Sequence, residues 1–152
     1  MAAINGQFDL AMKLIEKGAN PNIVSDAGTS PLFAVLERKW APKASYAHPI
    51  EHQQQQAIHL DVIRTLLESG ADPNIRMNQH LWYTEYTFFV MSSGGIHFEG
   101  ATPFWRATQA LDLDAMRLLK KYGANPDIAN TKRPKRRRPM DQTADPEELV
   151  NE

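Results

Sequence analysis

The chain has 152 residues, with 17 Lys and Arg against 18 Asp and Glu, a formal net charge of −1 and no cysteine. The absence of cysteine excludes disulfides, thiolate metal sites and a cysteine nucleophile. No apolar run approaches the roughly 18 residues of a transmembrane helix, and no signal-peptide pattern stands at residue 1, so we expect a soluble protein, cytoplasmic or periplasmic. Residues 132–138 hold six of the basic residues. The remainder is mildly acidic, which disfavours a broad nucleic-acid-binding face.

Three predicted helices along the chain each end in nearly the same sequence motif. The motif is Gly-Ala-(Asn/Asp)-Pro-(Asn/Asp)-Ile, and it stands at residues 18–23, 70–75 and 123–128. Glycine supplies the left-handed residue that ends a helix, and the following proline prevents its continuation. Recurrence after 52 and then 53 residues indicates a stacked repeat array. Apolar stripes precede the three glycines: Leu10, Met12, Leu14 and Ile15; Val62, Ile63, Leu66 and Leu67; Leu113, Met116, Leu118 and Leu119.

A second signal marks the start of the first helix in two of the units. Ser30-Pro31 and Thr102-Pro103 each place a capping hydroxyl before a proline at the first helical position. With both signals, residues 2–38, 57–76 and 99–129 resemble the ankyrin repeat, whose unit is about 33 residues long. The resemblance implies an all-α ankyrin-repeat solenoid of about two and a half helix-turn-helix units with extended loops or fingers. Its structural signature residues are Gly18, Pro31, Gly70, Pro103 and Gly123.

The intervals exceed one repeat by roughly 19 and 20 residues, so we predict two insertions. The array spans residues 1–129: a partial repeat at 2–24, a second at 25–76 with an insertion at 39–57, and a third at 77–129 with an insertion at 77–99. Residues 130–152 are a charged linker or tail. Neither end shows a polar capping repeat, so we expect a segment of a longer array or a partner that covers an end. Insertions in repeat arrays lie on loops, often at the binding face.

The first insertion contains His48, Glu51 and His52 in the pattern H-x-x-E-H, which holds zinc in one class of metallopeptidase. Pro49 is acceptable only at a helix start, which removes His48 from the face of His52, so the pattern does not favour zinc. We predict instead that the second helix of this repeat begins near Pro49 and includes Gln53–Gln56. Trp40 and Tyr46 either pack beneath the preceding loop or contact a partner.

The second insertion is rich in aromatic and β-forming residues before Gly94-Gly95, which favours an extended finger. Its rings either form a binding patch or fold back onto the core, and the two are compatible. The candidate partner-binding residues here are Trp82, Tyr83, Tyr86 and Phe88.

Phe33 and Trp105 stand where the ankyrin family usually has His after Thr-Pro-Leu. We predict that ring packing replaces the family's polar link at these positions. Alternatively, Trp105 and Arg106 face the groove and contact a partner. The tip residues 25–27, with Glu37 and Arg38, match positions that vary in the family to suit partners.

The basic run from Lys132 to Arg138 is either a phosphate-binding or import-like segment or a solvated linker. No aromatic residue is interleaved for base stacking, which favours the linker. We therefore predict a non-catalytic module, without cofactor or metal, that binds a protein partner through the ankyrin groove and both insertions as an accessory subunit of a larger complex. A zinc-dependent hydrolase and a nucleic-acid-binding protein are the alternatives, and small-molecule binding is not expected.

Overall fold

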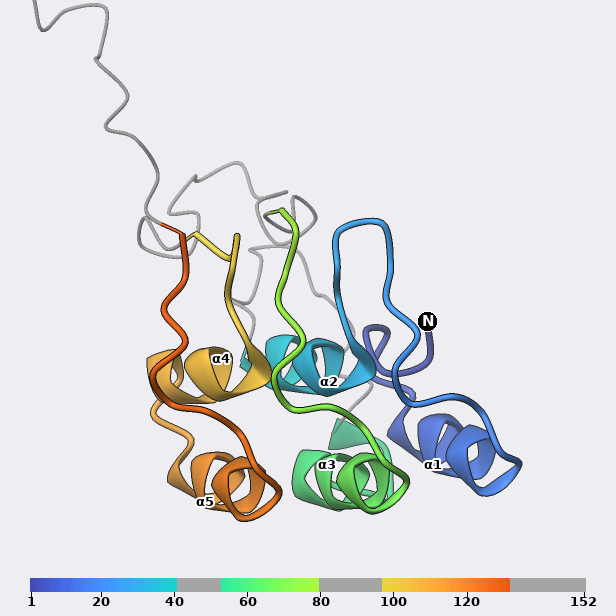
Figure 1. The fold of residues 1–152 in the computed structure, drawn as a ribbon. Coiled ribbons are helices and arrows are strands. Elements are labelled where there is room, and N and C mark those ends of the chain that lie inside the picture. The colour runs from blue at the N-terminus through green and yellow to red at the C-terminus, as the bar shows by residue number, and fades with distance from the viewer. Residues whose placement is uncertain (41–52, 80–96, 132–152) are drawn as a thin grey trace, which may run out of the picture.

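The computed structural model describes residues 1–40, 53–79 and 97–131, and these residues form five α-helices and no strand (Figure 1). The all-α prediction is confirmed for this part of the chain. The helices are α1 (Phe8–Glu16), α2 (Pro31–Trp40), α3 (His59–Glu68), α4 (Pro103–Gln109) and α5 (Leu113–Lys121).

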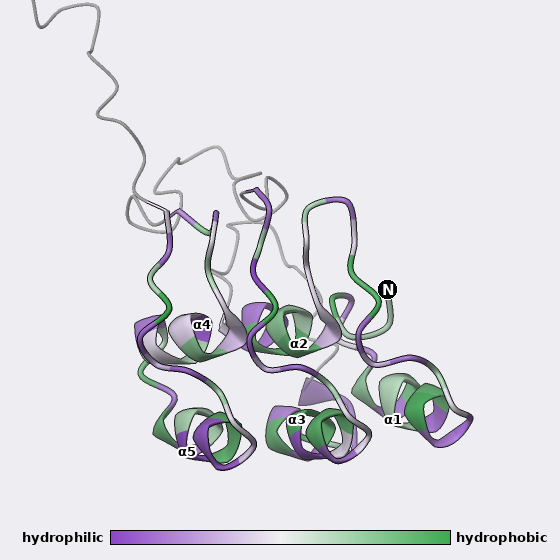
Figure 2. Cartoon of the chain, viewed as in Figure 1, coloured by the Kyte–Doolittle hydropathy of each residue, from purple (hydrophilic) through white to green (hydrophobic). Residues whose placement is uncertain are grey.

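The helices lie in two rows, with α2 and α4 in one row and α1, α3 and α5 in the other (Figure 1). Within a unit, α2 packs on α3 and α4 packs on α5. Between units, α1 contacts α3, α3 contacts α5 and α2 contacts α4. The hydrophobic sides of the helices supply one core that crosses all units and includes Val35, Val62, Ile63 and Leu119 (Figure 2). No unit buries its apolar side chains alone.

The predicted helix starts are confirmed by two side-chain caps. Ser30 Oγ accepts a hydrogen bond from Phe33 N at 3.2 Å, and Thr102 Oγ1 accepts one from Trp105 N at 3.1 Å. In both units a proline follows the cap as the first helical residue, where no N–H is needed.

The predicted helix ends are confirmed as well, since the closing glycines are left-handed, with φ of 85°, 89° and 91° for Gly18, Gly70 and Gly123. After each of the first two closing glycines, an asparagine of one unit binds the equivalent turn of the next unit. Each of these asparagines donates to the next glycine carbonyl and accepts from the N–H two residues beyond it. The bonds are Asn22 Nδ2 to Gly70 O (2.8 Å), Asp72 N to Asn22 Oδ1 (2.7 Å), Asn74 Nδ2 to Gly123 O (3.1 Å) and Asn125 N to Asn74 Oδ1 (2.8 Å).

The two described stems of the second insertion pair with each other. Met77 N donates to Ala101 O at 2.9 Å, and Gly100 N donates to Met77 O at 2.8 Å. Neighbouring finger loops continue the pairing, since Asn78 N donates to Ala27 O and Thr131 N donates to Glu99 O, both at 2.8 Å. The described residues on the two sides of 80–96 are therefore paired stems.

The predicted helix start near Pro49 is wrong for the residues that can be compared. Residue 53 belongs to a 3₁₀ segment, residues 54–57 are bends, and α3 begins at His59. The cause is Asp9 in α1, whose carboxylate accepts from Gln56 N at 3.0 Å and from Ala57 N at 2.8 Å. These hydrogen bonds hold the two N–H groups outside a helix, and they lower the pKa of Asp9.

We expect Asn74→Ala to lower the free energy of unfolding by about 1 kcal/mol, because two exposed hydrogen bonds between units are lost. Urea denaturation followed by circular dichroism measures the change. Asp127→Ala is the matched control, since Asp127 holds the same position after Gly123, and we expect about 0.5 kcal/mol or less there. Equal losses in both variants would contradict the proposed role of the asparagine.

Candidate interaction surface around Asp112

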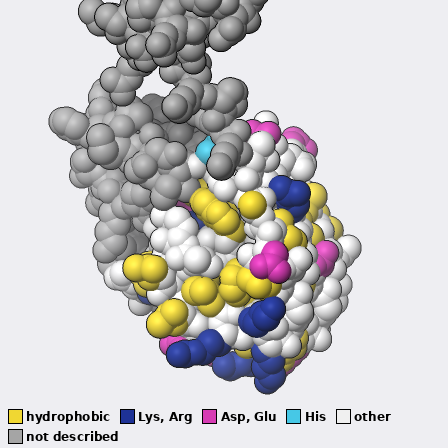
Figure 3. All heavy atoms as spheres, turned by 60° about the vertical axis from the view of Figure 1, so that its left-hand side comes forward, with side chains coloured by type: hydrophobic (Ala, Val, Ile, Leu, Met, Phe, Trp, Pro, Cys, Tyr) yellow, Lys and Arg dark blue, Asp and Glu magenta, His cyan; other side chains and the backbone are white. Residues whose placement is uncertain are grey.

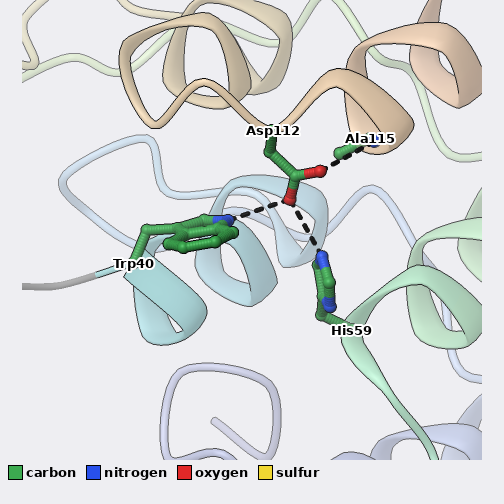
Figure 4. A network of polar contacts seen from close by, with 4 residues as sticks. All are labelled: Trp40, His59, Asp112 and Ala115. Carbon is green, nitrogen blue, oxygen red and sulfur yellow. Dashed lines mark hydrogen bonds and ion pairs between the residues drawn. The ribbon is translucent and has the colours of Figure 1, made fainter.

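Asp112 lies between α4 and α5, and its carboxylate joins three helices (Figure 4). Oδ1 accepts from Ala115 N at 3.0 Å and so caps α5. Oδ2 accepts from Trp40 Nε1 and contacts His59 Nε2, both at 2.9 Å. Trp40 is the last residue of α2 and His59 is the first of α3. Since a carboxylate only accepts, His59 carries its proton on Nε2.

The pKa of Asp112 lies below its ordinary value. Burial alone raises it, but hydrogen bonds from Ala115, Trp40 and His59, with the charge that His59 carries when it is protonated, lower it further than burial raises it. The indole and imidazole rings meet edge to face at a centroid distance of 6.3 Å. Three donors satisfy this carboxylate, which suits a structural clamp and leaves little capacity for a general base.

Exposed apolar side chains surround the clamp. We call Trp40, Ile58, Leu111 and Leu113 the apolar rim: all four are exposed, and each either binds Asp112 or adjoins a residue of the network in the chain. Figure 3, which brings the α4–α5 end forward, shows hydrophobic side chains exposed beside Lys and Arg. Exposed large apolar side chains gathered near one network make this a candidate interaction surface.

Leu111 has a left-handed backbone with φ of 57°, and its side chain is 82% exposed. The equivalent position of the first unit, twelve residues before the closing glycine, is Gly6, with φ of 75°. A leucine in this conformation costs about 1 kcal/mol relative to the helical region. Its side chain recovers none of that cost by burial.

Of the sequence-predicted site residues, Trp105 is half-buried and packs in a second, smaller core. The prediction of ring packing is confirmed: Phe33 meets Phe98 at 5.6 Å and Phe98 meets Trp105 at 6.2 Å, both edge to face. Met77 belongs to the same cluster. The sequence analysis did not single out Phe98 as a member of this core. An aromatic residue two positions before Gly100 was a signal that could have identified it.

The expectation that Arg106 and Glu37 face a partner needs correction, because both side chains are buried. Arg106 Nε donates to Glu37 Oε2 at 2.5 Å, and Nη1 donates to Gln109 Oε1 at 2.5 Å. The guanidinium also lies 5.8 Å from the centre of the Phe98 ring. A buried guanidinium keeps its charge and requires a carboxylate, so this pair joins α2 to α4 inside the structure.

The other predicted residues lie outside the described part of the chain. Within that part, no group of His, Cys, Asp or Glu side chains could hold a metal ion. Among the same residues, no helix combines the length and apolar character needed to cross a membrane. The predicted residues outside are Tyr46, Trp82, Tyr83, Tyr86, Phe88, the zinc pattern His48, Glu51 and His52, and the basic run 132–138.

We expect Asp112→Ala to lower the free energy of unfolding by about 2 kcal/mol near neutral pH, since a helix cap and two further donors lose their acceptor. Because the folded-state pKa is lowered, this stabilisation is present above the ordinary value of 3.8 and is lost as the pH falls through the folded-state value.

Denaturation curves from about pH 7 down to about pH 3 measure the difference between wild type and variant, which should shrink on acidification. Asp114→Ala is the control, since Asp114 lies in the first turn of α5 and makes only an exposed contact with Arg117. A pH-independent effect of Asp112→Ala would exclude the carboxylate as its source.

Comparison with known proteins gives one family. Residues 55–78 match the family model of the ankyrin repeat, a stretch that contains α3 and the closing turn at Gly70. No curated protein matches the chain. The paired helices and their repeated caps extend the likeness to the ankyrin repeat beyond the matched residues.

Proposed function

We propose that this chain is a non-catalytic protein-interaction module that binds a partner through the apolar rim and its two insertions, as an accessory subunit of a larger complex. Ankyrin repeats suggest protein–protein interaction as the general activity. The observation that carries the finer proposal is Leu111, an exposed leucine in a strained backbone where the first unit has glycine.

Residues held in sparsely populated backbone conformations cluster at functional sites. Leucine at this position lowers stability and its side chain is 82% exposed, so a use of that side chain outside the fold accounts for it. Leu113 and Ile58 repeat the pattern, as exposed large side chains beside the residues that bind Asp112. An exposed aliphatic side chain that a partner covers contributes about 1.5 to 3 kcal/mol to binding.

Within the rim, the Trp40 side chain is held in place before any partner arrives. Trp40 is held at its indole N–H by Asp112, and its ring is held by His59. Lys39 Nζ lies 5.3 Å from the centre of the Trp40 ring and adds a cation at the edge. A pre-ordered aromatic side chain loses little entropy on binding, which favours its use as an anchor.

The predicted insertion residues Tyr46, Trp82, Tyr83, Tyr86 and Phe88 remain part of the proposal, and so does half-buried Trp105. Arg106 is withdrawn, because it is committed to Glu37. Zinc-dependent hydrolysis and nucleic-acid binding rest on residues outside the described ranges, and no described residue favours either, so they are not proposed.

We expect Leu111→Gly to raise the free energy of unfolding by about 1 kcal/mol, because glycine adopts a left-handed backbone without strain. The same variant should weaken partner capture, since the exposed side chain is removed. Thermal denaturation and affinity capture from the source cells measure the two effects. A gain in stability with undiminished capture would remove Leu111 from the binding surface.

We expect Leu113→Asp to reduce capture of the rim's partner at least about tenfold, because a carboxylate must then be desolvated beneath an apolar contact. Quantitative mass spectrometry of captured proteins measures this. Leu10→Asp makes the same change at a leucine of similar exposure on α1 and should leave that partner's capture unchanged. Circular dichroism checks that both variants fold. If the double variant Leu111→Gly with Leu113→Asp captured every partner of the wild type, the rim would not be the binding site.

A further inference from the structure

Asn5 and Gly6 form the one Asn-Gly pair of the sequence, and they lie in the turns before α1. In such a pair the peptide nitrogen of the glycine is placed to attack the side-chain amide carbon of the asparagine. Glycine has no side chain to hinder that approach, and its backbone adopts many conformations. The pair is therefore a candidate for spontaneous loss of the side-chain amide.

The other described asparagines differ from Asn5 in the residue that follows and in what holds the side chain. Proline follows two of them and has no N–H to supply the attacking nitrogen. Isoleucine, whose branched side chain crowds that nitrogen, follows two more. Asn78 lies in a paired stem, where the N–H of the next residue, Gln79, donates to Ala27 O at 3.3 Å. The side chains that form hydrogen bonds are Asn20, Asn22, Asn74, Asn125 and Asn130.

The fold holds the two reacting groups of this pair only weakly. Asn5 is exposed, and no described residue hydrogen-bonds to its side chain. Gly6 is buried, and its N–H donates to Ala3 O at 3.2 Å, the long end of the usual range. This single bond opposes the reaction, and it belongs to a turn outside the helices. Local opening of such a segment costs little free energy, so the reaction remains open to the folded protein.

We propose that Asn5 is a deamidation site of the folded protein, a property independent of partner binding. Gly6 N loses its proton and bonds to Asn5 Cγ, the bond from Cγ to Nδ2 breaks, and the amide leaves with that proton as ammonia. Water then opens the five-membered succinimide ring. Attack of water at Cγ gives aspartate. Attack at the backbone carbonyl carbon of Asn5 leaves Cγ bonded to Gly6 N, which gives isoaspartate.

The reaction changes the first unit in two ways. Both products replace a neutral amide by a carboxylate, and isoaspartate also adds one carbon to the backbone before Gly6. Two hydrogen bonds span this point, Gly6 N to Ala3 O and Gln7 N to Ala2 O at 3.0 Å. Ala3 and Phe8, on either side of it, are buried in the core. Isoaspartate therefore alters the spacing between two core residues.

The test incubates the full chain at neutral pH and physiological temperature, beside a synthetic peptide of residues 1–13 as the unfolded reference. Trypsin releases the peptide that ends at Lys13, which contains Asn5 and no other asparagine. Chromatography with mass spectrometry should show this peptide converting to two products that carry a carboxylate in place of the amide. The rate in the folded protein should lie within about tenfold of the rate in the free peptide, because the turn opens easily. Both rates should rise with pH, since the attacking nitrogen must lose its proton.

Two variants copy the other units of the chain. Gly6→Leu introduces the residue that the third unit has at Leu111, and Asn5→Ala introduces the residue that the other units have at Ala57 and Ala110. We expect Gly6→Leu to slow loss of the Asn5 amide at least about tenfold, because a side chain now crowds the attacking nitrogen. Asn5→Ala should abolish the mass change of the peptide. Circular dichroism checks that both variants fold.

Three outcomes would overturn the inference. The first is an unchanged Asn5 in the folded protein after the free peptide has largely converted, which would show that the fold protects the pair. The second is equally fast deamidation at Asn78, which would show that the following glycine is not decisive. The third is a mass change that persists in Asn5→Ala, which would assign it to Gln7 in the same peptide. The second and third outcomes do not depend on the folding of Gly6→Leu.

Discussion

Each unit of this chain buries its apolar side chains only against a neighbouring unit, and the remaining features follow from that constraint. Val35, Val62 and Leu119 belong to different units but to one core. Hydrophobic contact is not directional, so it does not by itself fix how one unit is aligned with the next. The polar groups at the boundaries supply that alignment. Asn22 and Asn74 each contribute an oriented donor and acceptor to the following turn.

The same boundaries explain how a long insertion is accommodated between α2 and α3. Asp9 of the first unit holds the backbone of Gln56 and Ala57, and Asp112 of the third unit holds Trp40 and His59. Both carboxylates have lowered pKa values because these donors stabilise the ionised form. The ends of the insertion are thus fixed by units on either side of it. Since the entropy of closing a loop grows slowly with its length, the fixed ends make added length inexpensive.

Sequence reasoning succeeded where the cause lies within a few residues. A hydroxyl before Pro31 and glycine after α1 determine a local conformation, so the caps and the left-handed turns were predictable. It failed where the cause is distant in the chain. Asp9 lies almost 50 residues from the segment whose N–H groups it binds outside the helix. Glu37 lies 69 residues from Arg106, with which it forms a buried ion pair. The local sequence around Arg106 is compatible with an exposed or a buried side chain, and only the position of Glu37 distinguishes the two.

Comparison of the units with one another adds information that the family pattern does not contain. Gly6 and Leu111 occupy one position, and so do Asn22, Asn74 and Asp127. Gly6 in the first unit shows that glycine suits the left-handed turn. Asn22 and Asn74 show that the boundary between units uses a side chain with both a donor and an acceptor. A residue that differs at such a position can therefore be compared with its equivalent in another unit of the same molecule. Leu111 costs stability while its side chain stays exposed, and Asp127 lacks the donor that Asn22 and Asn74 supply to the following turn. Neither residue supplies to the array what its equivalent in another unit supplies.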